Sequence, residues 1–409
     1  MNDKDPISFD NTEFAFAYKT DSQLKKAHFL FSSMGKPWLV NFGLKVTPYA
    51  IKWHLPFTKT VIQNTIFQQF VGGETLAQTA KVADKLEQYK VQVILDYGVE
   101  GMEGEESFDH AEEEFKRVIA YAATQANIPF MSIKVTGFAR FALLEKLDSA
   151  MNAATGTLMK RYLQAIESLP ANEKEEWHRV RTRMLRICEE AAEKNIGVLV
   201  DAEETWIQDP VDALTILMMD TFNKTKVAVF NTLQLYRVDR LQFLKDSYDA
   251  AAERNFILGA KIVRGAYMDK ERKRAAELNY LSPIQPNKEA SDKDYNLALE
   301  FCIDHIEKIS VIVASHNEYS NLYATQLLDK KQLPHNHSHI HFSQLYGMSD
   351  NITFNLAKSG CSVSKYLPFG PIKDVVPYLM RRAQENSSVA GQTGRELTLI
   401  KKEMKRRGI

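Results

Sequence analysis

Polar side chains stand at or near the ends of eight short apolar runs, and their types are those of a ligand-binding site. They are Asp96, Lys134, Asp201, Gln234, Lys261, Arg264, His316, Gln344 and Lys365. Each alone has a structural explanation, because an Asp after a strand often caps a helix and a Lys in a strand often pairs with a carboxylate. A buried pair such as Lys134 with Asp201 is costly unless a further group, such as a ligand, satisfies it. Polar residues at nearly every run therefore favour a site for an anionic small molecule.

A second candidate cluster, formed by Tyr378, Arg381, Arg382 and Glu385, lies near the end of the chain. Residues three or four apart share one face of a helix, so the ring can lie beside one guanidinium and Glu385 can pair with Arg381. Two interpretations stay open at this point. The cluster is either a solvated charged face or a bidentate clamp for a carboxylate or phosphate.

The eight apolar runs predict strands that are buried on both faces, because they are rich in Val, Ile and Leu and do not alternate with polar residues. They cover residues 91–95, 131–135, 197–200, 227–230, 259–263, 311–314, 340–342 and 362–366. Helical sequence follows or flanks most of them, as in residues 109–125, 177–194, 239–254 and 293–307. This order predicts an α/β protein with a (β/α)8 barrel, whose reactive residues stand at the carboxyl ends of the strands.

The barrel is expected to occupy residues 91–409, with a helical insertion at residues 141–170 between the second and third strands. Residues 1–90 predict an N-terminal helical cap. Within it, residues 53–70 carry Trp53, Leu55, Phe57, Ile62, Ile66 and Phe67. This region either docks on a bilayer surface or caps the barrel, and we favour the cap.

The composition excludes several classes of protein. The 409 residues include 52 Lys and Arg and 52 Asp and Glu, so the net charge is zero, which argues against a nucleic-acid-binding protein. Three scattered cysteines, Cys188, Cys302 and Cys361, indicate a reducing compartment, and the first two are expected to be buried free thiols in helices. We find neither a signal peptide, nor a transit peptide, nor a membrane span, so we expect a cytoplasmic protein.

Several familiar catalytic motifs are missing. The chain has no dinucleotide-binding glycine fingerprint, no P-loop, and no common zinc-protease or serine-hydrolase motif. Four alternating histidines, His335, His337, His339 and His341, suggest a metal site. They straddle a loop and a strand start on the side of the barrel away from the active face, so we expect no metal there.

Taken together, the strand ends resemble proline dehydrogenase, a family of FAD-dependent barrel enzymes. The matching motifs, in the family's order, are V-D-A-E-E at 200–204, Q-L-Y at 234–236, V-R-G-A-Y at 263–267 and Y-L-M-R-R-A-Q-E-N at 378–386. The stretch R-A-A-E-L-N-Y at 274–280, continuing to Pro283, is most similar to the monofunctional branch that includes mitochondrial enzymes. The resemblance extends from about residue 70 to residue 406.

This resemblance implies oxidation of L-proline to 1-pyrroline-5-carboxylate, with hydride transfer to N5 of FAD and electrons passed to a membrane quinone. The implied substrate contacts are Lys134, Tyr267, Leu345, Tyr366, Tyr378, Arg381 and Arg382, the three cations holding the carboxylate. The implied FAD contacts are Asp201, Ala202, Gln234, Lys261, Val263, Arg264, Gly265, His316, Asn317, Gln344 and Glu385. Asp201, Lys261 and Tyr366 are the expected catalytic residues, because the flavin supplies the redox chemistry and the protein supplies orientation and charge.

Two positions bear on the details of the resemblance. Lys261 stands where many bacterial members carry Arg, so the positive charge is kept but the planar fork is lost. Tyr366 stands where hydroxyproline-oxidising relatives tend to have a smaller residue. A ring at that position is expected to crowd a 4-hydroxyl group, which favours proline as the substrate.

Three alternatives remain open. The first is the same reaction on trans-4-hydroxy-L-proline. The second is a metal-dependent barrel hydrolase that uses Asp201, Glu203 and His316. The third is an inactive barrel that senses proline through Lys134, Arg381 and Arg382, although this does not explain the motifs assigned to flavin. The quinone implies peripheral contact with a membrane, at the inner face if the protein is cytoplasmic.

Overall fold

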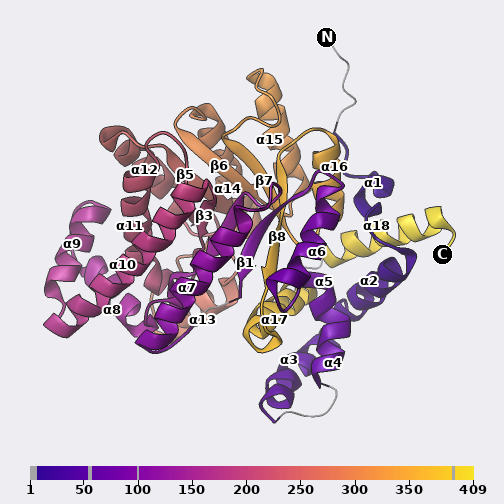
Figure 1. Cartoon of the computed structure of the whole chain (residues 1–409), viewed down its shortest axis with the longest axis horizontal. Coiled ribbons are helices and arrows are strands. Elements are labelled where there is room, and N and C mark those ends of the chain that lie inside the picture. The colour runs from indigo at the N-terminus through magenta and orange to yellow at the C-terminus, as the bar shows by residue number, and fades with distance from the viewer. Residues whose placement is uncertain (1–6, 54–57, 99–100, 389–391) are drawn as a thin grey trace. The chain divides into compact units, whose positions relative to one another are not determined.

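Eight parallel strands follow one another in chain order around a closed barrel (Figure 1). They are β1 (Gln92–Tyr97), β2 (Phe130–Ile133), β3 (Gly197–Val200), β4 (Val229–Gln234), β5 (Leu258–Val263), β6 (Ile309–Ala314), β7 (Ile340–Leu345) and β8 (Val363–Phe369). This computed structural model describes residues 7–53, 58–98, 101–388 and 392–409. The predicted (β/α)8 class is confirmed.

The strands form where apolar runs were found, but the ends of most of them differ from the prediction. β2 ends at Ile133, so Lys134 follows the strand instead of lying in it. β4 extends to Gln234, and β8 extends to Phe369, where it still pairs with Tyr97 of β1. Hydrophobicity marks burial, whereas the ends of a strand are set by pairing with its neighbours, so the apolar runs located the strands but not their limits.

The chain forms two compact units, and each is described by itself. Unit 1 comprises Met1–Gly98, His316–Leu322 and Phe342–Ile409, and unit 2 comprises Val99–Ser315 and Tyr323–His341. Helix α15 (Glu318–Lys330) has residues in both.

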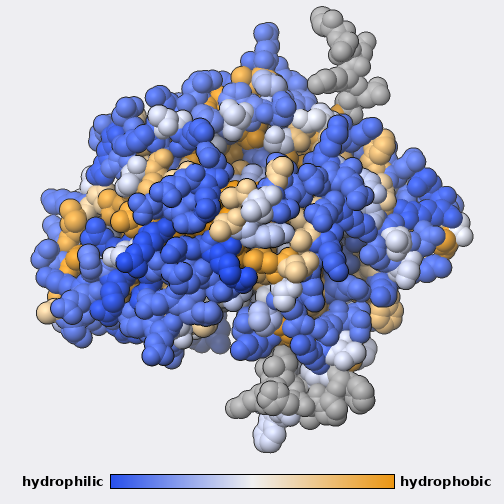
Figure 2. Space-filling view, in the orientation of Figure 1, coloured by the Kyte–Doolittle hydropathy of each residue, from blue (hydrophilic) through white to orange (hydrophobic). Residues whose placement is uncertain are grey.

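Unit 2 holds strands β2 to β6 and most of the helices of the barrel. These are α7 (Glu105–Ala122), the 3-10 turn η2 (Val135–Gly137), α8 (Phe141–Ala153), α9 (Leu158–Ser168), α10 (Ala171–Lys194), α11 (Thr205–Phe222), α12 (Arg240–Arg254), α13 (Met268–Glu277) and α14 (Lys288–Asp304). Helices α8 and α9 confirm the insertion predicted at residues 141–170. Helix α10 buries Trp177 and Met184 and ends at Asn195, whose φ of 56° is left-handed. Figure 2 shows hydrophilic residues over the outward side of α7 and α10.

Unit 1 joins the N-terminal helices to strands β1, β7 and β8 and to the last helices of the chain. The helices are α1 (Thr12–Phe16), α2 (Asp21–Met34), α3 (Pro37–Lys52), α4 (Thr58–Ile62), the π-helix η1 (Gln63–Phe67), α5 (Gln68–Phe70), α6 (Leu76–Glu87), α16 (Asp350–Lys358), α17 (Ile372–Ser388) and α18 (Gln392–Arg407). Their shared core includes Phe16, Phe31, Phe70, Val375 and Leu399. A capping box of Thr20 and Gln23 fixes the start of α2.

Some apolar side chains of residues 53–70 are buried in the core of unit 1, and others are exposed. Ile62 and Phe67 are buried in the core of unit 1, and Ile66 packs against it. Trp53 is 73% exposed, whereas Leu55 and Phe57 lie outside the described residues. Ile62 and Phe67 therefore pack within unit 1 and are not available to a bilayer, whereas the capping of the barrel by residues 1–90 stays a prediction.

Three further features bear on the class of protein. Cys188, Cys302 and Cys361 are buried free thiols, which confirms the expectation for the first two. Among the described residues, no helix is both long enough and apolar enough to serve as a membrane span. Of the four histidines, His335 contacts Asp329 at 2.8 Å and His339 contacts the Ile306 carbonyl at 2.7 Å, while burial lowers the pKa of His341 to about 3.

Asn223, which caps the C-terminus of α11, ties that helix to two strands. Its side-chain oxygen accepts from the backbone N–H groups of Ala228 and Val229, both at 2.9 Å. Its amide nitrogen donates to the carbonyls of Val229 at 2.8 Å and Ile257 at 3.1 Å. Because Asn223 is fully buried, water cannot replace these bonds.

We expect Asn223→Ala to lower the free energy of unfolding by about 3 kcal/mol or more, because each buried group left without a partner costs about 1–3 kcal/mol. Equilibrium unfolding in urea measures the change. Thr221→Ala, an exposed substitution near the end of the same helix, serves as the control and is expected to change stability by less than about 0.5 kcal/mol. Equal effects of the two substitutions would contradict this role of Asn223.

Candidate active site

The carboxylate of Asp201 lies between two lysines at the carboxyl ends of the strands in unit 2. Asp201 follows β3, Lys134 follows β2 at 3.2 Å, and Lys261 on β5 forms an ion pair with the other carboxylate oxygen. Ser132 on β2 donates its hydroxyl to Asp201 at 2.7 Å. The pair anticipated between Lys134 and Asp201 is present, with a second lysine added.

These three charged groups are largely withdrawn from water. The side chains of Lys134, Asp201 and Lys261 are 11%, 13% and 6% exposed. Burial alone would raise the pKa of Asp201, but the charges of Lys261 and Lys134 outweigh it, so the pKa lies well below its usual value. Asp201 is therefore ionised, and the three groups sum to one positive charge, which favours an anionic ligand nearby.

The ends of β4 and β5 present an amide and a guanidinium. Gln234 donates its amide N–H to the Glu203 carbonyl at 3.1 Å, and its buried Oε1 has no hydrogen-bond partner in the described part of the chain. Arg264 follows Val263 and donates to Asp292 at 2.6 Å and to the Ser315 hydroxyl at 2.9 Å. Its guanidinium also lies over the Tyr295 ring, 4.3 Å from the centroid. The Gln234 oxygen is a buried acceptor available to a ligand.

The loop after β5 needs glycine at position 265. Gly265 has a φ of 140°, and a Cβ added there would lie 2.3 Å from a ring carbon of Tyr236. The backbone therefore approaches the Tyr236 ring more closely than any other residue would permit. Tyr267, the predicted wall residue, caps α13 two residues later.

The acidic residues after Asp201 have partners within unit 2. Glu203 accepts from the Thr136 hydroxyl at 2.7 Å, and Glu204 forms an ion pair with Lys270. Ala202, which lies between Asp201 and Glu203 in the sequence, is half-buried. Glu203 and Glu204 thus hold neighbouring loops.

The aromatic and cationic cluster of α17 lies in unit 1. The Arg382 guanidinium is 5.3 Å from the centroid of the Tyr378 ring and donates to Glu385 at 2.7 Å. The three-residue spacing lets Arg382 pair with Glu385, and the pair that we expected between Arg381 and Glu385 stays a prediction. Arg382 is 6% exposed, which corrects the interpretation of a solvated charged face for this residue, whereas Arg381 is half-buried.

Two buried polar atoms of this cluster are unsatisfied. Within the residues that the structure describes, neither the Tyr378 hydroxyl nor Arg382 Nε has a hydrogen-bond partner. Burial raises the pKa of Tyr378 above its usual value, so its hydroxyl stays protonated and can donate. Since buried polar groups are nearly always paired, these two atoms indicate a place for a ligand.

Strands β7 and β8 bring Leu345 and Tyr366 together, because the two residues pair in register. Gln344, one position earlier, bonds through both ends of its amide, to Asn321 at 3.2 Å and to Thr353 at 2.8 Å. Lys365 is fully buried and forms an ion pair with Asp350 at 2.9 Å. Successive residues of a strand point to opposite faces, so Tyr366 and Lys365 contribute to different surroundings.

His316 and Asn317 follow β6. His316 Nδ1 lies 2.9 Å from the hydroxyl of Ser349, which has a left-handed φ of 51°. Asn317 accepts from the Ser320 backbone N–H at 3.1 Å at the start of α15. Asn317 therefore has the role of a helix cap in addition to the flavin contact implied for it.

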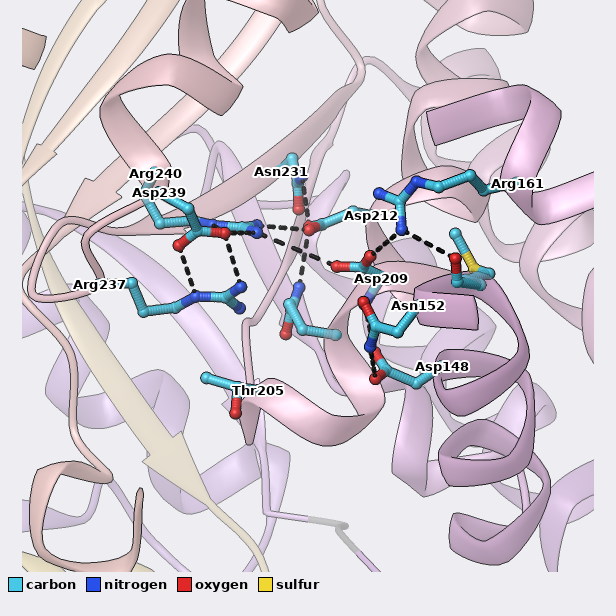
Figure 3. A network of polar contacts seen from close by, with 12 residues as sticks. Asp148, Asn152, Arg161, Thr205, Asp209, Asp212, Asn231, Arg237, Asp239 and Arg240 are labelled. Carbon is cyan, nitrogen blue, oxygen red and sulfur yellow. Dashed lines mark hydrogen bonds and ion pairs between the residues drawn. The ribbon is translucent and has the colours of Figure 1, made fainter. Parts of the chain in front are cut away.

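A network that the sequence analysis missed surrounds α11 (Figure 3). Arg240 donates to Asp212 at 2.6 Å, and Asn231 on β4 donates to the same carboxylate at 2.9 Å. Arg161 donates to Asp209 at 2.8 Å. These bonds fix the helix that directly follows the Asp201–Glu204 loop. Two acids three residues apart, Asp209 and Asp212, beside the apolar stretch of this helix were the signal in the sequence.

The structure thus brings together Lys134, Asp201 and Lys261 in unit 2, and Tyr378, Arg382 and Glu385 in unit 1. It also aligns Leu345 with Tyr366. The roles of these residues toward substrate and cofactor stay predictions.

The sequence profile of the proline dehydrogenase family matches residues 79–395, which is more than half of the chain. Proline dehydrogenase 1, mitochondrial, of Dictyostelium discoideum is 33% identical over 85% of this chain and 65% of its own length. Hydroxyproline dehydrogenase of Xenopus laevis is 31% identical over 85% of this chain and 78% of its own length.

The fold is shared with the solved structure of proline utilization A from Bdellovibrio bacteriovorus. The TM-score is 0.70 at 19% identity, over 95% of this chain and 40% of that one. The family that the motifs resembled is confirmed by the profile and by the relatives. The chain belongs to the proline dehydrogenase family.

Proposed function

We propose that this chain oxidises L-proline to 1-pyrroline-5-carboxylate, the first step of proline catabolism, and passes the electrons to a membrane quinone. The family supports the reaction. The observation that carries the proposal is the pair of buried, unsatisfied atoms on Tyr378 and Arg382. A carboxylate is the best hydrogen-bond acceptor for a buried guanidinium, and it can accept from donors of both residues.

Arg382, Arg381 and Lys134 are the residues that we propose for the carboxylate of proline. A guanidinium with one side bonded to Glu385 is held in a fixed plane, so its remaining donors are already oriented before the substrate arrives. Tyr267, Leu345, Tyr366 and Tyr378 are proposed to line the slot for the pyrrolidine ring. These contacts fix the ring in one orientation and exclude water from it.

Asp201 and Lys261 act in the proposed reaction through their charges. Asp201 holds both lysines in place, and Lys261 keeps a positive charge in a buried position at the end of β5. A cation fixed there stabilises negative charge that develops during hydride transfer. Tyr366 is the third residue that we place in catalysis, where its ring positions the substrate.

The residues present fit FAD. The free Gln234 oxygen can accept from a flavin ring N–H, the Arg264 guanidinium suits a diphosphate, and Lys261 suits an electron-rich ring. The further proposed contacts are Asp201, Ala202, Val263, Gly265, His316, Asn317, Gln344 and Glu385. When bound, FAD supplies the hydride acceptor, its N5 atom.

Two other reactions compete with this proposal. The Xenopus relative supports trans-4-hydroxy-L-proline as an alternative substrate. A metal-dependent hydrolase is disfavoured because Asp201 is bonded to two lysines and Glu203 to Thr136, and a carboxylate neutralised by ammonium groups is a poor metal ligand. The Dictyostelium relative is a mitochondrial proline dehydrogenase by name. For this chain we propose the cytoplasm and the inner face of a membrane.

The visible spectrum before and after anaerobic L-proline tests the proposed function. We expect flavin absorption near ~450 nm that bleaches with proline and hardly changes with hydroxyproline. Bleaching only with hydroxyproline would support the alternative substrate. A colourless protein that binds proline but cannot be reconstituted with FAD would support the sensor and overturn the proposal.

We expect Arg382→Met to raise the KM for proline more than tenfold, because the loss of one charge-assisted contact costs about 1.5–3 kcal/mol. Steady-state kinetics with a soluble dye as the electron acceptor measure the effect. Lys373→Met, which removes an exposed cation from the same helix, is the control and should leave KM unchanged. An unchanged KM in Arg382→Met would refute the carboxylate role.

We expect Tyr366→Ser to shift the ratio of kcat/KM values from proline toward hydroxyproline, because removal of the ring makes space for a 4-hydroxyl group. Tyr366→Phe keeps the bulk of the ring and should keep the ratio. The two variants are compared on both substrates under the same conditions. If Tyr366→Ser also leaves the ratio unchanged, crowding by this residue does not determine the choice of substrate.

A further inference from the structure

Helix α3 exposes a continuous stripe of large apolar side chains. The aromatic stripe consists of Trp38, Phe42, Val46, Tyr49 and Trp53, which are 69%, 62%, 40%, 67% and 73% exposed. At about 100° per residue these positions fall within an arc of about 80° on one side of the helix and its C-terminal turn. Scattered exposed apolar residues are normal, but a contiguous aromatic face indicates an interaction surface.

The opposite side of α3 is anchored in unit 1. Val40 is buried in the core of this unit and Leu44 packs against the same core. In Figure 1, α3 follows α2 and precedes α4 in this part of the chain. The helix is therefore held by one side, so the outward direction of the stripe is a feature of the fold.

The segment around the stripe carries an excess of positive charge, although one of its lysines, Lys59, pairs with Glu74 at 3.1 Å. From residue 22 to residue 73 the chain has six lysines and no Asp, Glu or Arg. Lys45 lies on the stripe's flank and is exposed. This local excess of six positive charges contrasts with the zero net charge of the whole chain.

A groove of about 590 Å³ beside α2 gathers more of this charge. It is lined by Lys19, Lys25, Lys26, Lys81 and Lys85, together with Phe29 of α2, and by no Asp or Glu. Lys26 bonds to Gln68 and Lys85 to Gln23, both at 3.3 Å, so neutral amides hold these two ammonium groups. Burial and the charge of Lys19 lower the pKa of Lys85. The groove suits phosphate groups.

The chemistry of this surface selects its partner. Trp and Tyr favour the boundary between headgroups and acyl chains, and lysines attract anionic headgroups. A helix of 16 residues, about 24 Å long, is too short to span a bilayer but can lie in its surface. A second copy of the chain is disfavoured, because a symmetric contact would place this lysine-rich surface against itself.

We propose that α3 docks on a bilayer of anionic phospholipid, with the aromatic stripe at the headgroup–acyl boundary and with Lys45 and the lysines of the groove over the phosphates. This inference rests on the membrane contact in the proposed function and deepens it, since the exposure and charge of unit 1 name the docking element and the class of lipid. It also replaces the stretch at 53–70 as the docking element: only Trp53 is common to both.

Co-sedimentation with vesicles tests the proposal. The wild-type protein should bind vesicles of phosphatidylcholine mixed with phosphatidylglycerol and bind pure phosphatidylcholine at least tenfold more weakly. A stripe variant, Trp38→Ser with Phe42→Ser and Tyr49→Ser, should bind the mixed vesicles at least tenfold more weakly. A charge variant, Lys25→Gln with Lys26→Gln and Lys81→Gln, should bind the mixed vesicles more weakly than the wild type and bind pure phosphatidylcholine as the wild type does. Added salt should make the difference in binding to the mixed vesicles between this variant and the wild type smaller.

Matched controls remove the same kinds of side chain elsewhere. The apolar control is Leu163→Ser with Val238→Ser and Leu281→Ser, all exposed residues of unit 2. The charge control is Lys160→Gln with Lys293→Gln and Lys308→Gln, also exposed and in unit 2. Both should bind vesicles like the wild type.

Fluorescence locates the inserted residues. Two of the four tryptophans, Trp38 and Trp53, belong to the stripe, whereas Trp177 is buried in unit 2. Brominated acyl chains should quench the emission of the wild type, and this quenching should be lost when both stripe tryptophans are replaced by Phe.

Three results would overturn the proposal. They are wild-type binding by the stripe variant, equal binding to neutral and anionic vesicles, and a dimer in sedimentation equilibrium that the stripe variant dissolves while vesicles stay unbound. Oxidation of proline with a soluble dye is measured on every variant and should be unchanged. Failure of docking is thereby separated from failure of the proposed reaction, because each assay proceeds without the other.

Discussion

The carboxylate of Asp201 is the contact on which the candidate site of unit 2 depends. It ties the residue after β3 to Ser132 on β2, Lys134 after β2, and Lys261 on β5. Removal of one partner from a buried ion pair costs about 3–5 kcal/mol, because the remaining charge stays buried. The network around α11 supports the same loop, because Asp212 and Asp209 fix the helix that follows it. The geometry of the strand ends is thus set by electrostatics as much as by the sheet.

Buried charges in unit 1 separate into two kinds, and the difference is whether protein groups satisfy them. Lys365 is fully buried, pairs with Asp350 at 2.9 Å and donates to the Met348 carbonyl at 2.6 Å. Tyr18 donates to the same Asp350 at 2.8 Å. Arg382 is nearly as buried, yet its Nε has no partner among the described residues. The first arrangement stabilises packing, whereas the second leaves hydrogen-bonding capacity for a ligand. Residue type alone could not show that Lys365 is satisfied by the protein whereas Arg382 is not.

The sequence predicted the barrel because strands covered on both faces need continuous apolar runs, and eight such runs are present. It could not predict the end of β2 at Ile133, since pairing sets that end, nor that Arg382 bonds to Glu385, since two arginines satisfy helical spacing. Motif order predicted Asp201, Gln234 and Arg382 as site residues, and only three-dimensional contacts revealed the second lysine on Asp201. The acids of α11 escaped notice because a buried acid in an apolar helix resembles a surface position until its arginine partner, distant in sequence, is known.

Apolar periodicity has the same limitation at the N-terminus, where it marks a face without saying what covers it. Ile62 and Phe67 belong to a face that packs on the core, whereas Trp38, Phe42 and Tyr49 belong to one that points outward. Charge separates the two cases better than hydrophobicity does. Residues 22–73 carry a net charge of +6, so the rest of this neutral chain carries −6. A total of zero therefore hides a local excess of positive charge, which the pairs of Lys59 with Glu74 and Lys19 with Asp350 reduce. It is this local field, screened over about 10 Å, that an anionic surface meets. An exposed aromatic face surrounded by lysines therefore differs from a face that packs in the core, where side chains are neither exposed nor flanked by charge.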